Sequence, residues 1–276
     1  MSVPARSISV PDQPASVAAA AAAAAPAHVT IRGLSKTFGN AVIYDRFDLD
    51  IPRGKLVSVF GPNGCGKSTL INMVAGLTPI DAGEILFAGK PLSQIKFGYV
   101  FQNYREALFP WLRSLANIEY PLKVMKVPKA ERRARVERLV SHLGVKIDLS
   151  RYPYQLSGGQ QQLVSIMRAL VVEPEILFLD EPFSALDYEM TLFMRQQLQR
   201  IFMETGTTTV LVSHDLEEAV YLADRILLLS RHPARVADYV HFDAARPRND
   251  DTLSDAGFIG IKAHCLDIFQ REVRRA

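Results

Sequence analysis

Residues 61–69 have the types and spacing that bind the phosphates of a nucleotide. They match the pattern G-x-x-x-x-G-K-[ST] in full, with the sequence Gly61-Pro62-Asn63-Gly64-Cys65-Gly66-Lys67-Ser68-Thr69. An apolar run, 56–60, comes directly before this segment and a helix start follows it, as the pattern requires. Glycines let backbone N–H groups converge on phosphate oxygens, and the helix N-terminus adds positive charge. The segment predicts a nucleotide site, with an ordinary glycine turn as the alternative.

Three side chains of this segment have separate expected roles. The Lys67 ammonium is expected to reach the outer phosphates, and the Ser68 hydroxyl is a ligand that suits Mg²⁺. Cys65 occupies a free position of the pattern. We therefore expect it to pack or to act as a spacer, without redox chemistry.

Two adjacent carboxylates end a second apolar run, 176–179. Asp180 stands at the carboxyl end of this predicted strand, and Glu181 follows it. Ligands of α/β sheets bind beyond the carboxyl ends of strands, so both acids are expected beside the phosphates. Adjacent residues of an extended chain point apart, which makes Asp180 the candidate metal ligand and Glu181 the candidate base for a hydrolytic water. His214 ends another predicted strand near the same edge, where a structural role is the alternative to a catalytic one.

A second segment, Leu156-Ser157-Gly158-Gly159-Gln160, precedes a helix predicted over 161–172. Ser-Gly-Gly before a helix is by itself usually an N-cap and a turn, but such a helix N-terminus also accepts phosphate. Since the chain already has one phosphate segment, two half-sites permit a two-fold dimer. Each nucleotide would then lie between residues 61–69 of one chain and the Ser-Gly-Gly segment of the other.

Hydrophobic periodicity predicts a parallel sheet covered by helices. Short apolar runs read as strands at 56–60, 176–179, 209–213 and 226–229, the second and fourth buried on both faces. Helical periodicity covers 67–75, 161–172 and 216–223. Asp215 and Glu218 are placed as a possible capping box for the last of these helices. Strand–helix–strand repetition of this kind is typical of an α/β fold.

Residues 105–155 break this alternation and are predicted to form a helical insertion. They contain Trp111 and a basic helix over 128–143, whose inner face holds Val136, Leu139, Val140 and Leu143. Between residues 123 and 151, nine Lys or Arg residues face three acids. A solvated helix surface usually causes such a run, and attraction to anionic lipid is the alternative.

Composition and the chain ends exclude several classes of protein. Of 276 residues 48% are hydrophobic, which excludes wholesale disorder, and two cysteines exclude a disulfide scaffold. A net charge of +3 is too small to indicate nucleic acid binding. Residues 1–27 read as a flexible Ala/Pro-rich leader, since alanine is too weakly apolar for a spanning helix or a signal. The polar tail from Arg231 is predicted to end in a helix over 258–273.

Together these motifs resemble the ATP-binding subunit of an ATP-binding-cassette (ABC) transporter over about residues 28–245. The P-loop 61–69, the signature 156–160 and the strand end 180–182 occur in the order and spacing of that family, as does the switch histidine, His214. Its D-loop corresponds to Ser184, Ala185, Leu186 and Asp187. The resemblance implies an α/β P-loop NTPase fold with a parallel core, an antiparallel β subdomain and a helical insertion at about 105–165. Residues 246–276 would form a short C-terminal tail.

The same resemblance assigns roles to further residues. Gln102 stands where the family's Q-loop glutamine coordinates Mg²⁺ and senses the transmembrane partner. Phe38 matches the aromatic residue that stacks on adenine, with a core position as its alternative. ATP and Mg²⁺ are the implied cofactors, and Lys67, Glu181 and His214 are the implied catalytic residues. The signature residues bind the ATP of the partner subunit; they are Ser157, Gly158, Gly159 and Gln160.

The resemblance also implies a mechanism and partners. Two identical subunits close head to tail over two ATP molecules, and hydrolysis reopens them and moves an integral-membrane permease. The expected location is peripheral, on the cytoplasmic face of the inner membrane, with a solute-binding protein as an indirect partner. Export, lipoprotein release and soluble non-transport ATPases are the alternatives. The chain lacks the second cassette of translation-factor relatives and the long coiled-coil insertion of repair relatives.

A finer resemblance is to the nitrate/sulfonate/taurine branch of importers. It is carried by Leu108-Phe109-Pro110-Trp111 after the Q-loop and by the tail segments 231–235 and 246–248. The sequence departs from the branch in a longer segment at 104–107 and in Leu163, where many relatives have arginine. Trp111 either packs into the core or forms a groove that receives a permease helix.

Overall fold

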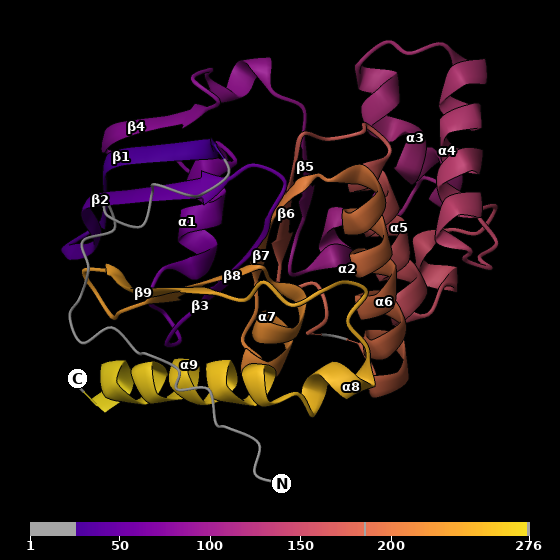
Figure 1. Cartoon of the computed structure of the whole chain (residues 1–276). Helices are drawn as coiled ribbons and strands as arrows, with labels where there is room; N and C mark the ends of the chain where they lie inside the picture. The colour runs from indigo at the N-terminus through magenta and orange to yellow at the C-terminus, as the bar shows by residue number, and fades with distance from the viewer. Residues whose placement is uncertain (1–25, 185, 275–276) are drawn as a thin grey trace, which may run out of the picture.

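The computed structural model describes residues 26–184 and 186–274. The leader predicted over 1–27 lies outside these ranges except for its last two residues. No helix within the described ranges is long and apolar enough to cross a bilayer. The described residues form two sheets with packed helices (Figure 1).

The larger sheet has six strands, of which five are parallel. They are β3 (Leu56–Phe60), β5 (Phe97–Val100), β6 (Ile176–Asp180), β7 (Thr208–Val212), β8 (Arg225–Leu229) and β9 (Val236–His241). Their order is β5-β6-β7-β3-β8-β9, and β9 pairs antiparallel with β8. The four predicted strands correspond to β3, β6, β7 and β8. Every residue of β3, β6 and β7 is buried, so burial on both faces is not limited to the two strands predicted.

A smaller antiparallel sheet confirms the predicted β subdomain. It is formed by β1 (Ala27–Phe38), β2 (Ala41–Pro52) and β4 (Ala82–Phe87) in the order β2-β1-β4. Its apolar face shares one core with helix α1 (Lys67–Val74) and with one face of the larger sheet. Tyr44 and Phe47 of β2 pack edge to face in this core, with ring centroids 5.0 Å apart. The small sheet therefore supports the helix that follows the P-loop.

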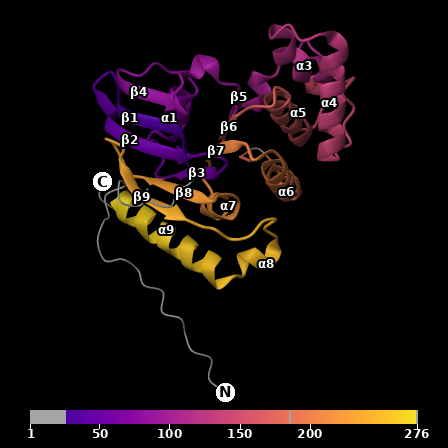
Figure 2. The same cartoon turned by 45° about the horizontal axis from the view of Figure 1, so that its top comes forward.

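Most of the other helices share a second core with the opposite face of the larger sheet. They are α3 (Ser114–Val124), α4 (Lys129–Leu143), α5 (Gly158–Leu170), α6 (Tyr188–Thr205), α7 (Leu216–Leu222), α8 (Asp250–Leu253) and α9 (Ala256–Arg274), and the short helix α2 (Tyr104–Ala107) lies against α5. Figure 2 shows α3 and α4 on the side of the larger sheet away from the small one. Helix α4 turns Val136 and Leu143 inward, as predicted. The side chain of Trp111 is 71% exposed, so its core alternative is wrong.

Two helix N-termini differ from the predictions, α5 in where it begins and α7 in how it is capped. Helix α5 begins at Gly158, three residues early, since the Ser157 hydroxyl accepts a bond from the Gln160 N–H at 3.3 Å. The Gln160 side chain in turn accepts the Ser157 N–H at 3.1 Å. At α7 only half of the predicted capping box forms: Asp215 accepts the Glu218 N–H at 3.1 Å, but the Glu218 carboxylate turns to another partner.

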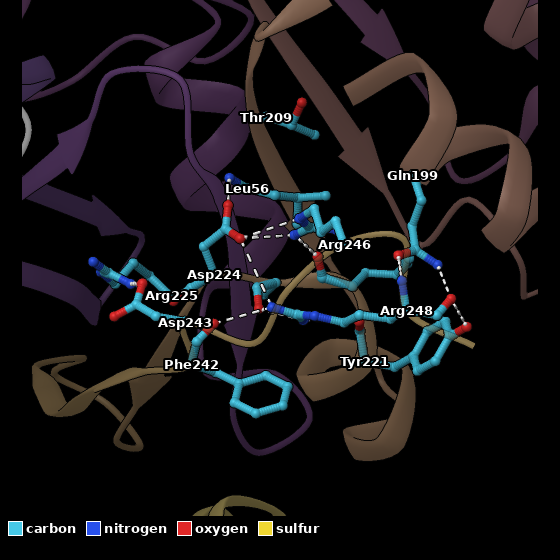
Figure 3. Close-up of polar contacts among 12 residues, drawn as sticks. Leu56, Gln199, Thr209, Tyr221, Asp224, Arg225, Phe242, Asp243, Arg246 and Arg248 are labelled. Carbon is cyan, nitrogen blue, oxygen red and sulfur yellow. Dashed lines mark hydrogen bonds and ion pairs between the residues drawn. The ribbon is translucent and has the colours of Figure 1, made fainter. Parts of the chain in front are cut away.

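The tail after β8 is more deeply packed than its polar sequence indicates. Residues 236–241 form the edge strand β9, and Arg248 is 2% exposed. Arg248 donates to the carbonyls of Val220, Tyr221 and Ala223 at 2.8–3.1 Å and to that of Phe242 at 3.0 Å (Figure 3). These groups include the free carbonyls at the end of α7, where a cation is favoured.

We call the buried contacts of Arg248 the clamp. A neighbouring arginine and a glutamine belong to it as well. Arg246 pairs with Asp224 at 2.9 Å, and Asp224 accepts the Leu56 N–H at the start of β3 (Figure 3). Gln199 of α6 bonds both backbone groups of Arg248, at 2.8 and 3.0 Å. Burial lowers the pKa of Arg248 to about 10, so the guanidinium stays charged at neutral pH. The tail thereby ties α6, α7 and β3 together.

Replacement of Arg248 by methionine is expected to lower the free energy of unfolding by about 3–5 kcal/mol, because it leaves buried carbonyls without donors. Urea unfolding measures this change. The matched control is Arg231→Met, at an exposed position, with an expected change within about 0.5 kcal/mol. Equal stability of the two variants would contradict the clamp.

Candidate nucleotide-binding site

The P-loop joins β3 to α1, and residues of strand β2 in the small sheet pack against it. Gly66 has φ 105°, in the left-handed region, and a Cβ there would lie 2.9 Å from Ile43 and 3.1 Å from the Tyr44 ring. The Tyr44 hydroxyl donates to the Gly66 carbonyl at 3.0 Å. Asn63 and Gly64 form an exposed tip. Sequence patterns did not identify Tyr44, because its contact with the loop depends on how β2 packs.

The start of α1 is suited to an anion. Gly66 offers no side-chain cap and the first turn holds no acid, so its N–H groups and dipole face outward. Lys67 is 7% exposed, and its ammonium donates to the carbonyls of Gly61 and Pro62 at 2.9 and 3.1 Å. The lysine thus lies against the P-loop, beside the place where the phosphates of the nucleotide are expected to bind. Cys65 is buried in the core beneath, and burial raises the pKa of its thiol.

The end of β6 brings an acid to the P-loop serine. Asp180 is 6% exposed and accepts the Ser68 hydroxyl at 3.0 Å. Burial raises the pKa of Asp180, and the Ser68 bond opposes this shift. Tyr99 of β5, which was not predicted, donates to Asn72 of α1 at 2.6 Å, and burial together with the charge of Asp180 raises the pKa of its phenol. Its contacts span distant segments, which a local pattern does not reveal.

Glu181 leaves the strand in an unusual conformation. Its φ is 45°, so the expectation that extended-chain alternation separates it from Asp180 is wrong. The Glu181 carboxylate accepts a hydrogen bond from the Gln102 side-chain amide at 2.8 Å, whereas Asp180 accepts the Ser68 hydroxyl. Nδ1 of His214 lies 3.3 Å from the same carboxylate oxygen. A non-glycine residue at positive φ carries strain, which often accompanies a functional position.

The structure therefore gathers six of the predicted residues at the carboxyl ends of β3, β5, β6 and β7. They are Lys67, Ser68, Gln102, Asp180, Glu181 and His214. Phe38, at the end of β1, is 50% exposed, so its core alternative is wrong. Thr69 continues α1 within its first turn.

The signature residues lie apart from this site, and the D-loop continues the chain directly after it. Residues 157–160 open α5, on the face of the larger sheet opposite α1, and within the described chain no hydrogen bond links them to the P-loop. Gly159 approaches α6 so closely that a Cβ would lie 2.6 Å from Met190. Ser184 donates to the Glu181 carbonyl at 3.1 Å, and Asp187 caps α6. Leu186 is partly buried, and Ala185 lies outside the described residues.

This geometry defines a P-loop nucleotide-binding protein with a candidate hydrolytic base beside the phosphate loop. Comparisons with known proteins give the family. A family model described as ABC transporter matches residues 44–184. The chain belongs to the ATP-binding proteins of ABC transporters, which hydrolyse ATP to drive transport.

Similar curated proteins come from several organisms. The sulfate/thiosulfate import ATP-binding protein CysA of Nocardia farcinica is 39% identical over 83% of this chain and 70% of its own. The sn-glycerol-3-phosphate import ATP-binding protein UgpC 1 of Rhizobium johnstonii is 41% identical over 74% of this chain, which spans 56% of that relative. An uncharacterized ABC transporter ATP-binding protein of Methanocaldococcus jannaschii, MJ0412, is 35% identical over 89% of this chain and 92% of its own.

Solved structures agree with the fold. The dimeric structure of MJ0796, a bacterial ABC transporter cassette, has a TM-score of 0.69 and 31% identity, and the match covers 79% of this chain and all of that one. A post-hydrolysis state of the same cassette, bound to ADP and Pi, has a TM-score of 0.68 with the same identity and coverage. The predicted fold class is confirmed.

Proposed function

We propose that this chain is the energy-coupling ATPase of an importer for nitrate, a sulfonate, taurine or a related small solute. The observation that carries the coupling role is the 2.8 Å bond between Gln102 and Glu181. It joins the candidate hydrolytic base to the segment after β5, which borders an open groove. Support for import of a small anion comes from the printed functions of the CysA and UgpC relatives. The segment 108–111 supports the finer branch.

The donors beside the P-loop fit Mg²⁺. Ser68 Oγ and Asp180 Oδ1 are oxygen atoms 3.0 Å apart. Gln102, whose side-chain nitrogen donates to Glu181, also carries an amide oxygen that suits Mg²⁺. In nucleotide sites Mg²⁺ takes one or two carboxylates together with phosphate oxygens and water. When bound it would neutralise charge on the phosphates during transfer. We assign its protein ligands to Ser68, Gln102 and Asp180.

The remaining side chains would carry out the hydrolytic step. The Glu181 carboxylate accepts a proton from the attacking water, and His214 holds that carboxylate and the γ-phosphate in register. Lys67 and the P-loop N–H groups hold the outer phosphates, and Phe38 stacks on the adenine from its exposed position at the end of β1.

A second copy of the chain would complete each site. The signature lies on the face opposite α1, which supports binding of a partner's nucleotide in place of the chain's own. The residues that would bind it are Ser157, Gly158, Gly159 and Gln160. The D-loop residues 184–187 follow Glu181 directly and would lie at the same interface. A homodimer that closes over two ATP molecules would be the resulting assembly, and the dimeric structure of the MJ0796 cassette supports the dimer.

The groove beside β5 would receive the permease. It has a volume of about 330 Å³ and is lined in part by Phe101, Phe109 and Tyr120. Phe109 contacts Trp111 with ring centroids 5.6 Å apart, and exposed aromatic residues are typical of interface centres. The subunit would thus be peripheral, on the cytoplasmic face of the inner membrane, with a solute-binding protein as an indirect partner and no role for nucleic acid.

Deletion of the gene tests this proposal. We expect loss of uptake of one solute among nitrate, sulfonates, taurine and sulfate, and recovery with the wild-type chain but not with Glu181→Gln. The tagged chain should co-purify with a membrane permease. Unchanged uptake of every solute, combined with accumulation of a compound inside the cells, would instead indicate an exporter.

A further inference from the structure

A buried ion pair lies directly behind the site and has no role in the chemistry above. Glu218 lies in the first turn of α7 with 6% of its side chain exposed. Its Oε1 is 3.6 Å from the guanidinium of Arg195 on α6, whose side chain is 11% exposed. Burying a charged side chain costs desolvation free energy unless it pairs with an opposite charge. Each of these two side chains is therefore expected to stay beside the other.

The second oxygen of Glu218 holds the turn that carries the switch histidine. It accepts the hydroxyl of Ser213, which is fully buried and directly precedes His214. The same hydroxyl oxygen accepts the Asp215 N–H at 3.0 Å. The backbone on both sides of His214 is therefore fixed through one carboxylate, although the histidine side chain itself is 55% exposed.

Arg195 connects this turn to the helix that follows the D-loop. Helix α6 begins at Tyr188, capped by Asp187, and Arg195 lies two turns further along the same helix. Figure 1 shows α6 and α7 beside each other at the lower end of the larger sheet. The pair is a direct link between these helices, so a displacement of α6 would be transmitted to the turn at 213–215.

We propose that Glu218 and Arg195 are positioning residues that hold His214 against the Glu181 carboxylate. The inference rests on the proposed catalytic roles of His214 and Glu181. Because a misplacement of about 1 Å at a reacting group costs up to about 10²-fold in rate, loss of the pair should reduce turnover without removing ATP-binding groups.

The test is a double-mutant cycle between Glu218→Ala and His214→Ala, measured as kcat and KM for ATP. Glu218→Ala alone is expected to lower kcat about 10–100-fold and to change KM for ATP less than about threefold. In the His214→Ala background it should have almost no further effect on kcat, because the group it positions is gone. Arg195→Lys, which keeps the charge, should restore most of the kcat lost in Arg195→Met.

The matched control is Glu217→Gln, next in sequence, which removes a half-exposed pair with Lys262 and should leave kcat unchanged. If Glu218→Ala does not fold, Ser213→Ala replaces it, since that variant removes the hydroxyl through which Glu218 holds the turn. Full turnover in the folded Glu218 or Ser213 variant, or losses that multiply in the double variant with His214→Ala, would overturn the positioning role. Full turnover in His214→Ala would instead overturn the catalytic role of His214 and, with it, this inference.

Discussion

Replacement of Glu181 by glutamine is expected to lower ATP turnover about 10²–10⁴-fold while ATP remains bound, because a general base contributes that much to rate. Glutamine keeps the shape of the side chain and can still bond Gln102, but it cannot take a proton from water. Steady-state phosphate release measures the turnover, and binding of a fluorescent ATP analogue measures the affinity.

The control for this variant is Glu84→Gln, at an exposed position of β4 in the small sheet. It should keep wild-type turnover. Unchanged turnover in Glu181→Gln would discard the base assignment. Loss of ATP binding together with turnover would show that Glu181 supports the loop and does not act in the chemistry.

Replacement of Lys67 by alanine is expected to weaken the binding of ATP. A charged hydrogen bond contributes about 1.5–3 kcal/mol, so the affinity for ATP should fall about 10–100-fold and productive phosphate binding should be lost. The ammonium also bonds two carbonyls of the P-loop, and its loss frees the loop from that restraint. Isothermal titration calorimetry with ATP and Mg²⁺ measures the change.

Lys90→Ala is the matched control, since Lys90 is exposed and its side chain has no part in the site. Its affinity for ATP should equal that of the wild type. Wild-type affinity in Lys67→Ala would contradict the phosphate role, provided that urea unfolding shows both variants to be folded.

Local patterns were sufficient for most of the fold and for the residues proposed for the site. The P-loop and the strand end at Asp180 are each continuous segments that follow a predicted strand. Because ligands of α/β sheets bind beyond the carboxyl ends of the strands, we expected them to meet although Ser68 and Asp180 are 112 positions apart. The family resemblance was confirmed by the family model and the curated relatives. The finer branch stays a proposal, because the CysA and UgpC relatives named above are import proteins for sulfate/thiosulfate and for sn-glycerol-3-phosphate.

Features that depend on tertiary packing were not predicted from the sequence. The edge strand β9 is only partly buried and lies in a polar tail, so it has little periodicity. Arg248 bonds groups 6 to 49 positions away in the sequence, and an arginine in such a tail is ordinarily solvated. The positive φ of Glu181 was not predicted, and for Trp111 the sequence left a core and a groove position open until the structure showed its exposure.

The most direct test is the mass in solution of Glu181→Gln, saturated with ATP and Mg²⁺, by light scattering. If each copy supplies half of every nucleotide pocket, the bound and unhydrolysed nucleotide should hold two chains together. We expect twice the mass of one chain with ATP and a single mass without it. A variant that stays monomeric with nucleotide, and that also fails to pair when reconstituted with its permease, would contradict the account.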